Sequence, residues 1–139
     1  MANQVYVEEK MEKDKLLYKE LTYKIIGVCF KVHSELGCGF PEKIYHKSII
    51  IELEKEGINY STEKLIKVKY SNKEVGTFRL DLAVDEKVIV ELKAVEFMPK
   101  IFKEKLLSYL KATPYQVGLL INFGRPKLEY ERIARIKSV

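Results

Sequence analysis

Residues 81–93 read DLAVDEKVIVELK, two apolar segments separated by the short polar turn DEK. Side chains alternate between the two faces of a strand, so a turn at residues 85–87 places the apolar residues of both segments on one side of a β-hairpin. In this register the facing pairs are Val84–Val88, Leu82–Val90 and Leu80–Leu92. A shift of one residue would separate the two apolar sets, so the pattern predicts this register.

The same register brings two carboxylates together on the opposite side of the hairpin. Asp81 lies opposite Glu91, and Arg79 lies opposite Lys93. Directly opposed side chains have Cβ atoms about 5 Å apart, and two carboxylates that close repel each other unless a cation or a proton intervenes. Oxygen ligands without histidine or thiolate suit Mg²⁺ or Mn²⁺. Lys93 could then orient the nucleophile or stabilise developing negative charge on a phosphate.

A solvent-exposed sheet surface with cross-strand ion pairs explains the same alternation of acids and lysine, and the spacing alone favours neither interpretation. Ala83, Ile89 and Val95 share the face with the charged residues. A face that mixes apolar and acidic side chains is more typical of a covered pocket than of an open surface. The metal site is therefore the preferred interpretation.

Length and composition indicate one soluble domain. The chain has 139 residues, of which 47% are hydrophobic and 32% are charged, as in an ordinary globular protein. Residues 1–15 are polar and are expected to be frayed or to form a short turn, so residues 16–139 form a single predicted domain. The N-terminus lacks the hydrophobic core of a signal peptide, and no apolar run is long enough for a bilayer. We therefore expect a cytoplasmic protein that does not bind membranes.

Charge and cysteine content narrow the classes of partner and cofactor. The net charge of +5 suits a polyanionic partner, although lysines spread along a chain are also typical of a solvated surface. Cys29 and Cys38 form no CxxC pair, and His33 and His46 lie far apart in the sequence. Neither a zinc site nor a disulfide framework is predicted.

Hydrophobic periodicity predicts a mixed sheet flanked by helices, an α/β (α+β) fold. The expected helices cover residues 16–36, 41–56 and 99–112, and the expected strands cover 63–70, 74–84, 87–95, 115–123 and 128–136. The glycines of GCGF stop the first helix, and Pro41 suits the first position of the second. The last strand alternates like a more exposed one. The predicted order of elements is ααβββαβ(β).

Several motifs resemble those of a known superfamily. Asp81, followed after a turn by ELK at 91–93, resembles the PD-(D/E)XK nuclease motif, with Leu80 where the motif has proline. The segment GFPEKIY at 39–45 has the glycine, glutamate and tyrosine spacing that names the GxxExxY protein family, a member of the same superfamily. The family's order of segments is also present over nearly the whole chain after the N-terminal segment: KVHSELGCGFPEKIY, RLDLAV, VIVELKA, LLSYLKAT and GLLINFG. The resemblance implies a restriction-endonuclease-like αβββαβ core.

The resemblance also implies a metal-dependent phosphodiesterase site. Asp81 and Glu91 would hold Mg²⁺ or Mn²⁺, and Lys93 would assist catalysis. Glu42 would be the helix-borne acid that many members direct at the metal. A carboxylate in the first turn of any helix gains from the helix dipole, which explains Glu42 equally well.

Four further residues have implied roles with open alternatives. Tyr45 would contact nucleic acid or be a partly buried structural tyrosine, and Gly39 would serve the backbone conformation. Related nucleases often carry QxxxY on the helix after the ExK strand, whereas this chain has Lys105 before Tyr109. Both would lie on one helical face toward nucleic acid. Lys105 could bind a phosphate, or pair with a site carboxylate and compete with the metal, but it lacks the paired donor and acceptor of glutamine.

Three functions fit these observations. The first is a Mg²⁺-dependent nuclease acting on DNA, favoured because Glu42, Asp81, Glu91 and Lys93 are all present. The second is a nucleic-acid-binding protein with little or no catalysis, and the third is a protein-interaction module on the same fold. A homodimer would supply the two active sites that cutting two strands commonly requires. The choice between DNA and RNA, and between internal and end cleavage, stays open.

Overall fold

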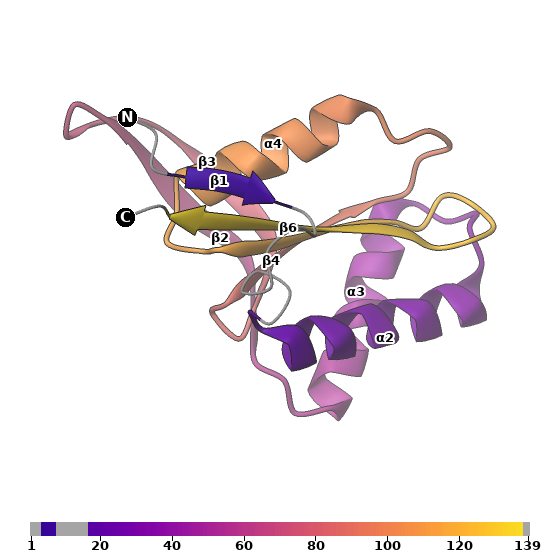
Figure 1. Cartoon of the computed structure of the whole chain (residues 1–139). Helices are drawn as coiled ribbons and strands as arrows, with labels where there is room; N and C mark the ends of the chain where they lie inside the picture. Colours follow the sequence, from indigo (N-terminus) through magenta and orange to yellow (C-terminus); the bar gives the residue numbers. More distant parts are fainter. Residues whose placement is uncertain (1–3, 8–16, 138–139) are drawn as a thin grey trace.

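A computed structural model describes residues 4–7 and 17–137 of the chain, which form a mixed β-sheet with helices on both faces (Figure 1). The elements are β1 (Gln4–Val7), α2 (Lys19–Leu36), α3 (Glu42–Lys55), β2 (Tyr60–Tyr70), β3 (Lys73–Val84), β4 (Val88–Lys93), α4 (Lys100–Lys111), β5 (Val117–Asn122) and β6 (Glu129–Lys137). Six strands are ordered β1-β6-β5-β4-β3-β2, and β4 and β5 pair in parallel while all the other neighbours are antiparallel. The predicted fold class is confirmed.

The two ends of the sequence differ from their predictions. Residues 4–7, expected to be frayed or turn-like, form β1, which pairs with β6. Four residues are too few to show a strand periodicity, and this strand depends on a partner more than a hundred positions away. The final strand is less exposed than predicted, because β1 and β5 flank it and Ile133 and Ala134 are buried. The rest of the predicted N-terminal segment lies outside the described residues.

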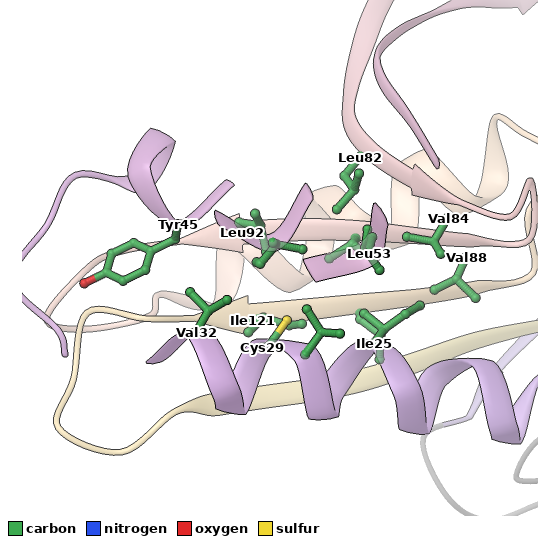
Figure 2. Close-up of a cluster of buried hydrophobic side chains, with 14 of the residues drawn as sticks. Ile25, Cys29, Val32, Tyr45, Leu53, Leu82, Val84, Val88, Leu92 and Ile121 are labelled. Atoms are coloured by element: carbon green, nitrogen blue, oxygen red, sulfur yellow. The ribbon is translucent and has the colours of Figure 1, made fainter. Parts of the chain in front are cut away.

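Two apolar clusters hold the layers together. The larger one lies between the sheet and helices α2 and α3, where Ile25, Cys29 and Val32 of α2 pack against strand residues (Figure 2). The smaller one lies on the other face, where Leu106 and Leu110 of α4 are buried against the sheet. The sheet therefore has apolar layers on both faces, and its central strands are almost fully buried.

The predicted hairpin register is confirmed for Val84–Val88 and Leu82–Val90, but the β3–β4 ladder ends before the predicted Asp81–Glu91 and Leu80–Leu92 pairs. The observed pairs are Leu82–Val90, Ala83–Ile89 and Val84–Val88. Leu80 was expected to face Leu92, but Leu80 packs in the α4-side cluster while Leu92 packs in the cluster under α2 and α3. The alternation of faces along β3 thus breaks between Leu80 and Leu82, at Asp81. An uninterrupted period of two cannot reveal such a break.

Candidate functional site

Asp81 lies where β3 loses its pairing on both sides. The recorded β3–β4 pairs end one residue away at Leu82, and the β2–β3 ladder runs from Thr62–Leu82 to Lys64–Leu80 without a Glu63–Asp81 pair. Glu63 adopts a φ of 54°, a left-handed conformation that a regular strand does not contain. Asp81 therefore has no ladder partner on either neighbouring strand, at the position where regular pairing would place it opposite Glu91.

A histidine of α3 fixes the backbone at this break. Nε2 of His46 lies 3.1 Å from the carbonyl oxygen of Asp81, so the imidazole N–H donates to a carbonyl near the interruption in β3. His46 follows Glu42 by one helical turn, so both side chains lie on the same side of α3. The helix that carries one candidate acid is thereby tied to the strand that carries another.

Glu91 is an almost fully buried carboxylate in the centre of β4. Only 8% of its surface is exposed. Burial, followed by the charge of Asp81, raises the pKa of Glu91 to about 7, while Lys93 and Lys105 oppose the shift and Glu42 adds to it. A carboxyl group with this pKa is half protonated near neutrality, because no protein cation compensates it fully.

Lys93 and Glu42 complete the charged group. The ammonium of Lys93 lies 4.3 Å from the ring centroid of Phe102 in α4, so a cation–π contact holds it beside the sheet. Burial raises the pKa of Glu42, Asp81 adds to this shift, and Lys93 opposes it. The structure therefore brings Glu42, Asp81, Glu91 and Lys93 within electrostatic reach of one another.

Helix α4 contributes Lys105 and Tyr109 from the opposite side. The charge of Lys105 lowers the pKa of Glu91, although its side chain is exposed. Tyr109 stacks on Phe78, with ring centroids 4.5 Å apart. Burial raises the pKa of the Tyr109 phenol, and Glu91 and Asp81 add to the shift. Both residues thus lie within electrostatic reach of the carboxylates.

Tyr45 and Gly39 are placed differently from the roles assigned to them. Tyr45 is fully buried, stacks on Phe123 with centroids 4.6 Å apart, and donates a hydrogen bond to the carbonyl of Gly37 at 2.6 Å. A side chain without exposed surface does not reach nucleic acid, so its structural alternative holds. The left-handed backbone belongs to Gly37, with φ 77°, and not to Gly39. Gly39 has no left-handed backbone, and a Cβ added there would meet no atom within 4 Å, so the conformation gives no reason for a glycine at this position.

Comparison with known proteins agrees with this geometry. The family model described as the PD-(D/E)XK nuclease superfamily matches residues 19–133. The chain belongs to the PD-(D/E)XK nuclease superfamily. The matched region contains all the residues discussed above, and the finer assignment to GxxExxY proteins stays a prediction.

A solved structure has a similar fold. The chain titled "Crystal structure of SSO0001" superposes with a TM-score of 0.53 at 17% identity, covering 88% of this chain and 61% of that one. At this identity the likeness concerns the fold alone, and this chain spans about three-fifths of its length. A search of curated proteins gives no match. No helix in the described part of the chain is long and apolar enough to cross a membrane.

The oxygen-only character of the site fits the divalent metals that PD-(D/E)XK nucleases generally use. Within residues 4–7 and 17–137, no group of three or more His, Cys, Asp or Glu side chains is arranged to hold a metal ion. Mg²⁺, however, commonly binds through one or two carboxylates and completes its shell with water and substrate phosphate. Asp81 and Glu91 could act as such a pair, because a bound cation would reduce the electrostatic repulsion between them.

Two residues beside the candidate site were not predicted from the sequence. His46 was considered only as a zinc ligand, although its position four residues after Glu42 already placed it beside the acid. Phe102 gave no local signal, because its contact with Lys93 joins a helix to a strand.

Proposed function

We propose that the protein is a nuclease that uses Mg²⁺ or Mn²⁺ to hydrolyse phosphodiester bonds, with DNA as its substrate. The observation that carries the proposal is the meeting of Asp81 and the buried Glu91 at the break in β3, with Lys93 beside them. Two carboxylates in a low-dielectric setting without a full complement of protein cations are suited to a bound divalent ion.

Each residue would have a distinct role. Asp81 and Glu91 would hold the cation, with Glu42 facing them from the first turn of α3. When bound, such an ion polarises a phosphoryl oxygen and lowers the pKa of a water. Lys93, held over the Phe102 ring, would donate hydrogen bonds to a non-bridging phosphate oxygen and orient the attacking water.

The substrate assignment rests on the superfamily and on charge. The net charge of +5 favours association with a polyanion. Lys105 and Tyr109 approach the carboxylates from α4, where a phosphate could meet the ammonium and a base or sugar could meet the ring. DNA and RNA share this phosphate chemistry, so an assay must offer both.

One observation favours a second function, nucleic-acid binding with weak or no cleavage. Lys105 acts on Glu91 electrostatically and therefore supplies part of the positive charge that a metal would supply. We expect Lys105→Gln to lower the Mg²⁺ concentration required for half-maximal activity, because it removes a competing cation. Unchanged metal dependence in this variant would show that Lys105 does not compete.

The proposal is tested by cleavage of labelled single-stranded, duplex and branched DNA, and of RNA, in Mg²⁺ or Mn²⁺. Glu91→Gln should abolish cleavage, as should EDTA. Glu74→Gln is the matched control, since Glu74 is an exposed acid at the far end of β3. Cleavage that survives Glu91→Gln would refute the assigned site. Binding without cleavage on every substrate would favour the second function.

A further inference from the structure

Three connections gather beside the candidate site at one end of the sheet. They are residues 37–41 between α2 and α3, residues 94–99 between β4 and α4, and residues 123–128 between β5 and β6. Figure 1 shows all three at the right-hand side of the molecule. The first leads directly into Glu42, and the second follows Lys93. We call these three connections the site rim.

Asn122 joins two parts of the rim. Its buried side chain accepts a hydrogen bond from the N–H of Val95 at 2.9 Å and donates one to the carbonyl of Val95 at 3.0 Å. Gly124 lies so close to the same segment that a Cβ added to it would be 2.3 Å from the backbone nitrogen of Val95. The β4–α4 and β5–β6 connections therefore pack backbone against backbone.

Arg125 and Tyr45 extend this rigid frame to all three connections. The guanidinium of Arg125 donates to the carbonyl of Glu96 at 3.1 Å, and its own carbonyl lies 2.8 Å from Nε2 of the buried His33. Tyr45 stacks on Phe123, and its hydroxyl accepts a hydrogen bond from the N–H of Phe40 at 3.1 Å. Side chains bonded to backbone groups thus link all three connections of the rim.

This rigid rim exposes large aromatic side chains. Phe97 is 72% exposed and Phe40 is 43% exposed, one from the connection after Lys93 and the other two residues before Glu42. Neither ring belongs to a buried apolar cluster, although the Phe40 ring contacts the buried Tyr45 edge-on with centroids 6.3 Å apart. Exposed cationic residues lie in or next to the same connections, namely Lys43, Lys100 and Lys127.

We propose that the site rim binds unpaired nucleotides, so that the substrate class is single-stranded nucleic acid or the unpaired part of a branched one. Bases would stack on Phe40 and Phe97 while the neighbouring lysines attract the phosphates, the combination that single-strand binding sites use. A regular duplex keeps its base faces stacked inside and offers these rings nothing to stack on. The inference rests on the proposed nuclease function, because it describes the substrate of the same site.

Binding is measured separately from cleavage to test this. Fluorescence anisotropy in EDTA, with the Glu91→Gln protein as background, compares a labelled single strand, the same strand with abasic sites, and its duplex. Phe40→Ala and Phe97→Ala should each weaken single-strand binding on the order of fivefold or more. Tyr23→Ala is the control, since Tyr23 is 79% exposed on α2 and lies outside the rim.

The pattern across substrates decides the outcome. Affinity for the abasic strand and for the duplex should hardly change in either phenylalanine variant, because neither ligand presents base faces to the rings. Equal losses for all three ligands, or no loss at all, would overturn the inference. Loss of a homodimer in these variants, measured by light scattering, with unchanged affinity for the single strand would assign the rings to a second copy instead. If no substrate is cleaved but the stacking pattern holds, the nuclease proposal fails and the binding inference stands.

Discussion

Replacing Glu91 by glutamine should make the protein more stable above neutral pH. Burial and Asp81 raise the pKa of Glu91 from its ordinary 4.5 to about 7. The folded protein therefore binds a proton more tightly than the unfolded chain does between these values, and wild-type stability falls as the pH rises from 4.5 through 7. Glutamine has nearly the shape of the protonated acid and does not ionise, so the variant escapes this loss.

The size of the effect follows from the shift. One pKa unit corresponds to about 1.4 kcal/mol, so the variant should exceed the wild type by about 3 kcal/mol at pH 8 and by about 1 kcal/mol at pH 5. Urea unfolding at both pH values measures the difference. Glu74→Gln, in an exposed acid of the same sheet, should show no such pH dependence.

Two results would refute this reasoning. One is a Glu91→Gln variant with the same stability advantage at both pH values, which would point to packing and not to charge. The other is no advantage at pH 8, which would mean that the carboxylate is already compensated. Repeating the unfolding with Mg²⁺ tests metal binding independently of the pKa argument. A cation that binds Asp81 and Glu91 should stabilise the wild type but not the variant.

Three other predictions follow from packing and charge. Gly124→Ala should destabilise the fold by about 3 kcal/mol or more, because the added Cβ would lie 2.3 Å from backbone atoms. Gly118→Ala should cost only about 1 kcal/mol, because its Cβ would meet a flexible leucine side chain at 2.9 Å. Equal losses of stability in urea unfolding would contradict this prediction. Burial raises the pKa of the Cys29 thiol, so a thiol reagent should label the exposed Cys38 rapidly in the native protein and both cysteines only after denaturation. Asp81→Asn should lower the pKa of Glu91, and an unshifted carboxyl resonance in an NMR titration would show that the two acids do not interact.

Local periodicity was sufficient for the hairpin and for most elements. The alternation of apolar residues predicted the Leu82–Val90 pair correctly, because residues 82–84 and 88–90 are buried and a slip there would move a whole set of side chains out of place. The break at Asp81 was invisible, since it depends on Glu63 of a third strand adopting a left-handed backbone. Asp81, Glu91 and Lys93 were predicted from spacing within one hairpin, whereas Glu42, Lys105 and Tyr109 were predicted from the resemblance to the nuclease superfamily.

Contacts between distant elements account for what the sequence did not reveal. The stack of Tyr45 on Phe123 joins a helix to the residue after β5, a contact that the pattern of residues within the helix does not reveal. Asn122 read as one polar residue in an apolar strand, yet its four hydrogen bonds lock the backbone that follows Lys93. A buried amide with every donor and acceptor used is a strong structural signal, but its partners are unknown until the fold is known.

The charges of the site explain why proton and metal should compete there. Glu42, Asp81 and Glu91 lie within electrostatic reach of Lys93 and Lys105, and His46 also acts on Glu42, so the acids outnumber the lysines when all are ionised. Without a metal, the least costly correction is protonation of the most buried acid, which is why the pKa of Glu91 rises to about 7. A bound divalent ion would make the same correction without the proton, so we expect its binding below pH 7 to release that proton and to weaken as the pH falls. Lys105, at the position where related nucleases were expected to carry glutamine, lowers the pKa of Glu91 and would reduce the charge available to attract a metal.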